Sequence, residues 1–193
     1  MKYGLEQEFF VTQDSKLIGP VPPPLTPDEC GFLAEARGQP CFTIREAVFS
    51  LMADVYRLET EATKLGLTLV KEPILEVPRS ILLECRHKFT KPTLDYQNLY
   101  GYQEHKNKGK KTAGIHISFT DERVILNDKK DPTVVNIIFD FVQIFRKLDL
   151  NFKAEIMAAK RYPGFYELKP DRRIEYRSLP NNCDLLKIIE VLS

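Results

Sequence analysis

The sequence predicts an α+β fold, in which a curved, mainly antiparallel sheet carries helices on one face and charged side chains on a concave face. Two observations favour it. Short segments rich in aromatic and β-branched residues are interrupted by longer segments of helical periodicity. Several expected strands also carry charges at every second residue, which places those charges on one face. Because 193 residues with 43% hydrophobic side chains can bury one core, we expect a single domain over 1–193.

The first expected strands bring acidic residues to one side. The segment "KYGLEQEFFVT" is typical of a strand, and Glu6 and Glu8 lie two residues apart, so they face the same way. The segment "TQDSKLIG" favours a turn into a short partner strand, and the prolines of "PVPPPLTPDEC" favour an extended connector over a helix. In "CGFLAEARGQP" the alternation predicts a second strand, with Glu35 and Arg37 on one face.

Capping residues mark the expected helices. The first begins after Thr43, which forms a capping box with Glu46, and ends at Gly66. Its apolar residues repeat at helical spacing, namely Val48, Leu51, Met52, Val55 and Leu58. A second helix is expected to begin at Asp131 and Pro132, a cap followed by proline at the first helical position. We further expect helices over 152–160 and 184–192.

Two later strands carry the remaining charges of the predicted face. The segment "TAGIHISFT" predicts a strand in which His116 shares a face with Gly114 and Ser118. The segment "RRIEYRSLP" predicts a strand with three charges on one face, namely Arg173, Glu175 and Arg177. The basic run "KNKGKK", residues 106–111, is expected to form a loop before the histidine strand.

Composition excludes several classes of protein. With 28 basic and 27 acidic residues the formal charge is +1, which gives no general attraction to nucleic acid or acidic membranes. We expect no structural zinc site because the four cysteines are scattered without a CxxC pair. No secretory signal opens the chain and no apolar stretch is long enough to span a membrane, so we expect a cytoplasmic protein.

The charged face has two interpretations. An antiparallel sheet often leaves one face in water, where charges are ordinary. Alternatively, carboxylates with one imidazole suit Mg²⁺ or Mn²⁺, and arginines beside them suit phosphate. Metal ions, carboxylates and arginines together are the requirements of phosphoryl transfer. The sequence has no GxxxxGK[ST] and no GxGxxG loop, so metals and sheet residues would have to hold a nucleotide.

Four segments, "GLEQEFF", "GFLAEARG", "KTAGIHIS" and "ELKPDRRIEYRSLPN", occur in an order that resembles a known family. They resemble the amidoligase (carboxylate–amine ligase) branch of the glutamine synthetase and glutamate–cysteine ligase superfamily, in particular its short phage-type members. The resemblance runs from about Gly4 to Asn181. It implies a sheet like that of the glutamine synthetase catalytic domain. It also implies an ATP-dependent ligase that joins a carboxylate to an amine through an acyl phosphate, with Mg²⁺ or Mn²⁺.

The resemblance also implies roles for individual residues. It implies metal ligands at Glu6, Glu8, Glu35, His116 and Glu175. It implies nucleotide contacts from Lys111, Lys169, Arg172, Arg177 and His116, and catalytic roles for Arg173, Glu175 and Arg177. The sequence departs from the family pattern at Ser118, where many relatives have a second histidine, and at Glu167, where relatives often have an arginine. Arg172 or Arg173 could replace that arginine, and Glu84 is a further candidate ligand.

The implied partners are small-molecule or peptide carboxylates and amines, and no membrane. The resemblance leaves the oligomeric state undecided and allows a homo-oligomer, since large members of the family build sites between subunits. Two other functions remain: a guanidino kinase-like phosphotransferase, and a non-catalytic module that binds nucleic acid through "KNKGKK". The balanced charge makes the nucleic-acid function the less favoured one.

Overall fold

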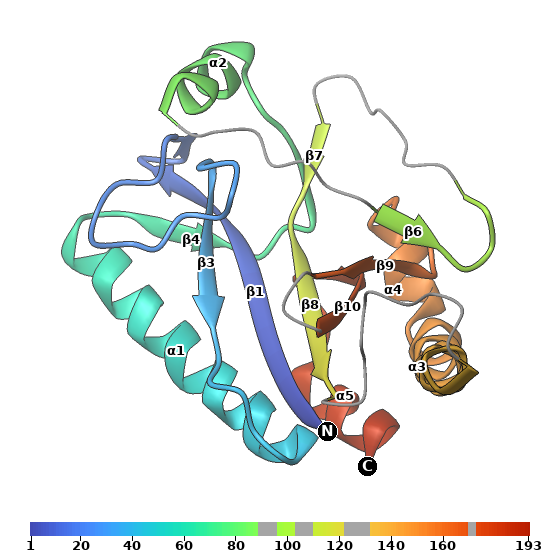
Figure 1. Cartoon of the computed structure of the whole chain (residues 1–193). Helices are drawn as coiled ribbons and strands as arrows, with labels where there is room; N and C mark the ends of the chain where they lie inside the picture. Colours follow the sequence, from blue (N-terminus) through green and yellow to red (C-terminus); the bar gives the residue numbers. More distant parts are fainter. Residues whose placement is uncertain (89–95, 103–109, 122–131, 170–172) are drawn as a thin grey trace.

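The structure is a computed structural model that describes residues 1–88, 96–102, 110–121, 132–169 and 173–193 (Figure 1). Within these residues the fold is mixed α/β, with five helices and an open, antiparallel sheet. The strands are β1 (Lys2–Gln13), β2 (Lys16–Leu17), β3 (Leu33–Arg37), β4 (Thr68–Val70), β5 (Ile74–Glu76), β6 (Tyr96–Asn98), β7 (Lys110–Thr112), β8 (Gly114–Thr120), β9 (Phe165–Leu168) and β10 (Arg173–Pro180). The helices are α1 (Ile44–Lys64), α2 (Arg79–Lys88), α3 (Pro132–Asn151), α4 (Lys153–Ala158) and α5 (Leu185–Leu192).

The long strand β1 lies inside the larger sheet and pairs with four other strands. The main order is β2-β1-β8-β10-β9-β6, and β3 and β4 also pair with β1. Every pairing given by the described residues is antiparallel, which confirms the predicted mainly antiparallel sheet. The register sets Glu6 opposite Arg37 on β3 and opposite His116 on β8. Charges far apart in the sequence therefore meet across neighbouring strands.

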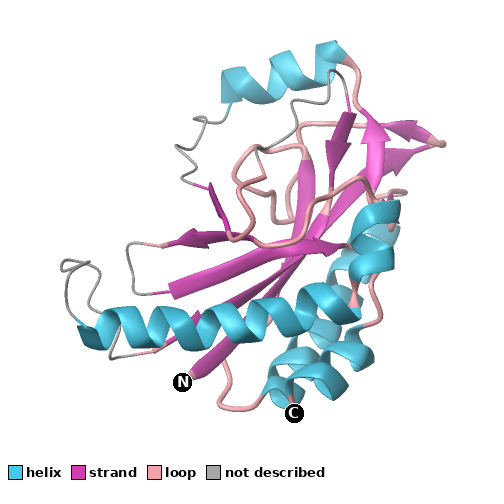
Figure 2. Cartoon of the chain, turned by 90° about the vertical axis from the view of Figure 1, so that its right-hand side faces the viewer, coloured by secondary structure: helices cyan, strands magenta, loops and turns pink. Residues whose placement is uncertain are grey.

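One face of this sheet is covered by helices. Leu5, Phe9 and Val11, which alternate with the glutamates of β1, are fully buried in the main hydrophobic cluster. Residues of α1, α3, α4 and α5 complete the cluster, and Figure 2 shows the helices against the strands. Each large apolar side chain buried there contributes about 1.5–3 kcal/mol. This burial orients β1, and with it Glu6 and Glu8, because side chains alternate across a strand.

Helix α1 begins and ends as the sequence predicts. Thr43 and Glu46 form the capping box, and Gly66 follows the helix with φ +69°. The predicted apolar stripe is buried except at Met52, which is 41% exposed. The helix ends where the sequence predicts, because glycine readily adopts the left-handed conformation that follows a helix C-terminus.

A second apolar cluster lies on the other side of β1. Phe10, Leu33 and Ala113 pack there with Val77 and with Cys85 of α2. The sequence analysis did not predict α2 or strand β5. It also assigned Lys110 and Lys111 to a loop, whereas they belong to strand β7 and pair with β5. Residues 106–109 and Asp131 lie outside the described residues.

Strand β10 contains a bulge at a defined place. Tyr176 pairs with Ile117 and Leu179 with Ile115, so two residues of β10 lie opposite the single residue His116. The extra residue reverses the alternation of side chains along β10. Leu179 and Glu175 are an even number of residues apart, yet Leu179 is fully buried in the main cluster on the opposite face. Bulges re-aim side chains and are frequent beside functional sites.

No described helix combines the length and apolar composition needed to cross a membrane.

Candidate functional site

The candidate site lies on the face of the sheet opposite the main helices. On β1, Glu6 and Glu8 alternate with the buried apolar residues, and on β8 His116 alternates with buried Ile115 and Ile117. The same alternation places Glu35 of β3 and Glu175 of β10 on this face. The predicted charged face therefore exists, and it is assembled from four neighbouring strands.

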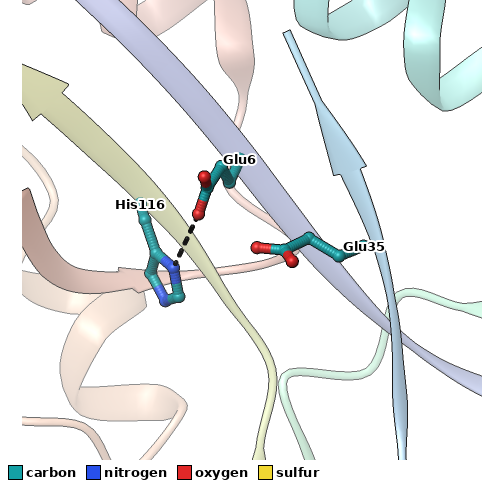
Figure 3. A group of neighbouring side chains, drawn as sticks. All are labelled: Glu6, Glu35 and His116. Carbon is teal, nitrogen blue, oxygen red and sulfur yellow. Dashed lines mark ion pairs between the residues drawn. The ribbon is translucent and has the colours of Figure 1, made fainter. Parts of the chain in front are cut away.

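Three of its side chains form a compact group. One ligand atom from each of Glu6, Glu35 and His116 lies within 4.8 Å of the others. Figure 3 shows the two carboxylates and the imidazole converging from β1, β3 and β8. His116 Nδ1 is 3.9 Å from Glu6 Oε2 and 3.8 Å from Glu175 Oε1. These distances are too long for hydrogen bonds.

His116 is the unsatisfied member of the group. Its side chain is 3% exposed, and among the described residues Nδ1 has no hydrogen-bond partner. A buried polar atom without a partner costs about 1–3 kcal/mol, so native proteins rarely leave one. The dashed line in Figure 3 joins His116 to Glu6 across the 3.9 Å between Nδ1 and Oε2, and a cation bound between these groups could satisfy Nδ1.

The two carboxylates differ in protonation. Burial and the neighbouring charge of Glu6 raise the pKa of Glu35 to about 9, against the lowering effect of Arg37. Burial also acts to raise the pKa of Glu6, but His116, Glu35 and Arg37 outweigh it and hold that pKa at about 2. Without a cation the pair therefore retains one proton at neutral pH, because two adjacent carboxylates, one buried and one partly buried, resist ionising together.

Basic residues flank the group on both sides. On one side Arg37 Nε donates to Glu35 Oε2 at 2.9 Å and lies 4.0 Å from Glu6 Oε1. On the other side Arg177 Nη1 contacts Glu175 and lies 3.3 Å from Glu167 Oε2.

The row of charges continues beyond Arg177. Lys169 Nζ lies 2.9 Å from Glu167 Oε2 and 3.8 Å from Glu29 Oε1. Acids and bases thus alternate across the face from β3 to β9.

Glu8 takes a more structural position than the resemblance implies. Its Oε2 accepts a hydrogen bond from Gly114 N at 2.9 Å and lies 3.8 Å from His116 Nε2. Glu8 is not part of the group within 4.8 Å. Asn181 Nδ2 donates to the Glu8 carbonyl and Gln7 Nε2 donates to the Asn181 carbonyl, so the end of β10 is tied to β1 beside the site.

Other predicted residues lie at the margin of the face. Lys111 Nζ lies 6.0 Å above the Phe32 ring, in the region of the second cluster. Arg173 opens β10 opposite Thr120, and Glu84 is an exposed residue of α2. Arg172 lies outside the described residues. A pocket of about 490 Å³ lies beside α2 and is lined by Glu76, Val77, Pro78, Arg79 and Leu82, none of which belongs to the charged face.

The two departures from the family pattern have defined places. Ser118 Oγ donates to Glu175 Oε2 at 3.2 Å, so it helps to hold that carboxylate. Glu167 lies directly opposite Glu175 on β9 and contacts both Arg177 and Lys169. It therefore orients two basic residues at this end of the charged face.

Two residues near the site were missed. Burial and the charge of Glu8 raise the pKa of Asp28 to about 6, although its position in the proline-rich connector gave no signal. The guanidinium of Arg161 lies where a side chain of Gly114 would be, 2.8 Å from an ideal Cβ. The glycine before the histidine strand was the signal for a close approach.

No family model matches the chain, and no curated protein matches it either.

Proposed function

We propose that this protein is an ATP-dependent carboxylate–amine ligase with a glutamine synthetase-like catalytic sheet. The observation that carries the proposal is the convergence of Glu6 and Glu35 on His116, whose buried Nδ1 has no partner among the described residues. A solvated sheet face does not require such a group, because its charges point into water. The motif resemblance supplies the reaction class.

The donor atoms fit a hard divalent cation. Ligands at about 2.1 Å from one Mg²⁺ or Mn²⁺ lie roughly 3–4 Å apart, slightly closer than the 4.8 Å limit of this group. Glu6, Glu35 and His116 would hold the ion, with Glu175 beside them. When bound, the ion would neutralise phosphate charge and the repulsion between the carboxylates.

The basic residues have complementary tasks. Arg177 is held by Glu175 and Glu167, so its guanidinium is oriented before any substrate binds. It would contact the transferred phosphoryl group, where a planar guanidinium suits two oxygens. Lys169 would exchange its contact with Glu29, at 3.8 Å, for a phosphate oxygen.

The proposed reaction has two steps. A substrate carboxylate oxygen attacks the γ-phosphorus of ATP, the bond to the β-phosphate oxygen breaks, and ADP leaves. The amine nitrogen then attacks the acyl carbon, the carbon–oxygen bond breaks, and inorganic phosphate leaves as the amine loses a proton. The phosphoryl transfer comes first because a carboxylate oxygen becomes a good leaving group only after it is phosphorylated.

Hydroxylamine provides a direct test, since it replaces the amine and traps acyl phosphates as hydroxamates, which form coloured complexes with added Fe³⁺. The protein, Mg²⁺, ATP and hydroxylamine would be incubated with each of the twenty amino acids and with short peptides. We expect at least one carboxylate to give a hydroxamate together with ADP, and we expect Glu175→Gln to abolish both.

Glu59→Gln is the matched control, because Glu59 lies on α1 in an exposed ion pair with Lys71. It should retain the wild-type rate. If ATP yields a phosphorylated guanidino compound and no hydroxamate, the kinase-like alternative replaces the ligase. If neither ATP nor Mn²⁺ binds on calorimetry, the proposal is wrong.

A further inference from the structure

We propose that Arg161 is a positioning residue, which holds the bulge of β10 so that Arg177 is aimed into the charged face. The importance of Arg177 rests on the proposed ligase function. The position of Arg161 follows from its contacts with Arg177 and Gly114, which do not depend on that function.

The bulge creates the need for such a residue. Arg177 and Ser178 together oppose the single residue His116, so the regular ladder between β10 and β8 is interrupted beside the site. A backbone group released from the ladder needs another partner. Ser178 Oγ accepts from Phe165 N at 2.9 Å, and Arg161 Nη2 donates to the Arg177 carbonyl. The two contacts hold the bulge from two directions.

Gly114 makes room for the guanidinium. It has the same parity on β8 as His116, so a side chain there would point toward the charged face. An ideal Cβ on Gly114 would come within 2.8 Å of Arg161 Nη1 and 2.9 Å of Nη2. The guanidinium of Arg161 therefore lies on the site side of β8, against the bare backbone. Gly114 N also donates to Glu8 Oε2, so this strand end contacts both a site carboxylate and Arg161.

The backbone of Arg161 is fixed by the end of α4. Arg161 N donates to the Ile156 carbonyl at 3.0 Å, and Lys160 between them has φ +54°. This is the hydrogen bond and left-handed residue of a helix C-cap, in which glycine is usual. A lysine there is strained, because its Cβ is crowded by the following carbonyl oxygen. Ile156 is fully buried and α4 packs on β10, so the cap is anchored to the strand that Arg161 contacts.

The first experiment observes Arg177 without any ligand. The Nε–Hε resonance of Arg177, identified through Arg177→Lys, would be followed by NMR in Arg161→Ala and Arg161→Lys. We expect a clear shift in Arg161→Ala and partial recovery in Arg161→Lys. Arg57→Ala is the matched control, because it removes a guanidinium from exposed ion pairs on α1. An unchanged Arg177 resonance in Arg161→Ala, whatever the stability of the variant, overturns the proposal.

A double-mutant cycle then tests the role of Gly114. Gly114→Ala should displace the flexible guanidinium and shift the Arg177 resonance in the wild-type background. In the Arg161→Ala background the added methyl group has room, so Gly114→Ala should produce no further shift. Additive shifts would show that Gly114 and Arg161 act independently, against the inference.

Nucleotide binding separates this inference from the proposed function. With Mn²⁺ and a non-hydrolysable ATP analogue, we expect Arg161→Ala to bind the analogue about tenfold more weakly, the effect of one misplaced charge-assisted hydrogen bond. Binding of Mn²⁺ alone should be unchanged. If the wild type binds no analogue, the ligase function fails, while the Arg177 resonance still decides the positioning role. Equal losses of Mn²⁺ and analogue binding would mean a general structural defect and overturn the inference.

Discussion

Two clusters of polar side chains in the described part of the chain differ in how completely their hydrogen-bonding groups are satisfied. On the helix side, Asp149 is 5% exposed and accepts hydrogen bonds from Tyr176 Oη at 2.6 Å, Tyr100 Oη at 2.9 Å and Gly164 N at 2.9 Å. On the opposite side, Glu6 and Glu35 lie together beside His116, whose Nδ1 has no partner among the described residues.

The difference distinguishes a structural cluster from a candidate binding site. Asp149 joins α3 to β10 and to the turn before β9, and its three donors compensate for burial. The charged face places two carboxylates where they repel and leaves a nitrogen unsatisfied, so it lowers stability unless something binds. We therefore interpret the cluster whose hydrogen bonds are all formed within the fold as structural, and the cluster with an unsatisfied nitrogen as a candidate ligand site.

The largest expected effect is on metal binding. Glu6→Gln should weaken Mn²⁺ binding by roughly 100-fold or more, because even residues behind the ligands of a metal site change affinity 10–100-fold. Glu6→Gln should also lower the free energy of unfolding at neutral pH, because the lowered pKa of Glu6, about 2, means that the fold favours its ionised form. Isothermal titration calorimetry with Mn²⁺ measures the first effect and urea unfolding the second. An unchanged Mn²⁺ affinity would mean that Glu6 is not a metal ligand and that the charged face, like the Asp149 cluster, has only a structural role.

The second effect concerns the Asp149 cluster. Asp149→Ala should lower the free energy of unfolding by about 2–4 kcal/mol, because it leaves buried Tyr176 Oη and Gly164 N without their acceptor. Tyr100→Phe removes a single donor and should cost about 1 kcal/mol. Chemical denaturation measures both changes. Mn²⁺ affinity should stay at the wild-type value in both variants, and its loss would contradict the separation of the two clusters.

A third effect is the pH dependence of stability. Glu35 has a pKa of about 9 in the fold against an ordinary value of 4.5, so the folded state binds its proton more tightly than the unfolded state. The contribution is complete below pH 4.5 and is lost as the pH rises to about 9, with a slope of at most about 1.4 kcal/mol per pH unit. Glu35→Gln should flatten the profile in this window. A wild-type slope retained by the variant would assign the effect to another group.

The smallest effect concerns the end of α4, where Lys160 has φ +54°. Lys160→Gly should raise the free energy of unfolding by about 0.5–1 kcal/mol, because glycine adopts a positive φ without strain. Lys147→Gly is the control, since Lys147 is an exposed residue inside α3 and glycine there should lower stability by a similar amount. Thermal unfolding measures both. Destabilisation by Lys160→Gly would indicate that the lysine side chain itself stabilises this end of the helix.

Local patterns in the sequence predicted much of the fold and the centre of the candidate site. Strand alternation depends only on neighbouring residues, so Glu6, Glu35 and His116 could be assigned to one face before any pairing was known. The capping box of α1 was likewise visible as Thr43 and Glu46. Helix α2 follows directly after Pro78, in a segment where two prolines obscured its short periodicity.

The missed residues depend on long-range geometry. Glu167 makes its contacts because the strand register sets it opposite Glu175, and the sequence of one strand does not determine its register with another. Arg161 is placed by the C-cap of α4 and by the space over Gly114, which combine segments nearly fifty residues apart. Lys110 and Lys111 looked like part of a loop because their partner β5 was not recognised.

The position of β1 in the sheet has a consequence for how the protein folds. Gly114 N binds Glu8 across 106 residues, and Gln7 binds Asn181 across 174 residues. Such contacts carry a high loop-closure entropy and are characteristic of slowly folding topologies. In the unfolded chain the acidic residues are far apart and hydrated, and they approach one another only when the two ends of the chain have joined the same sheet. A fragment of the protein that lacks either end therefore cannot assemble this arrangement of charges.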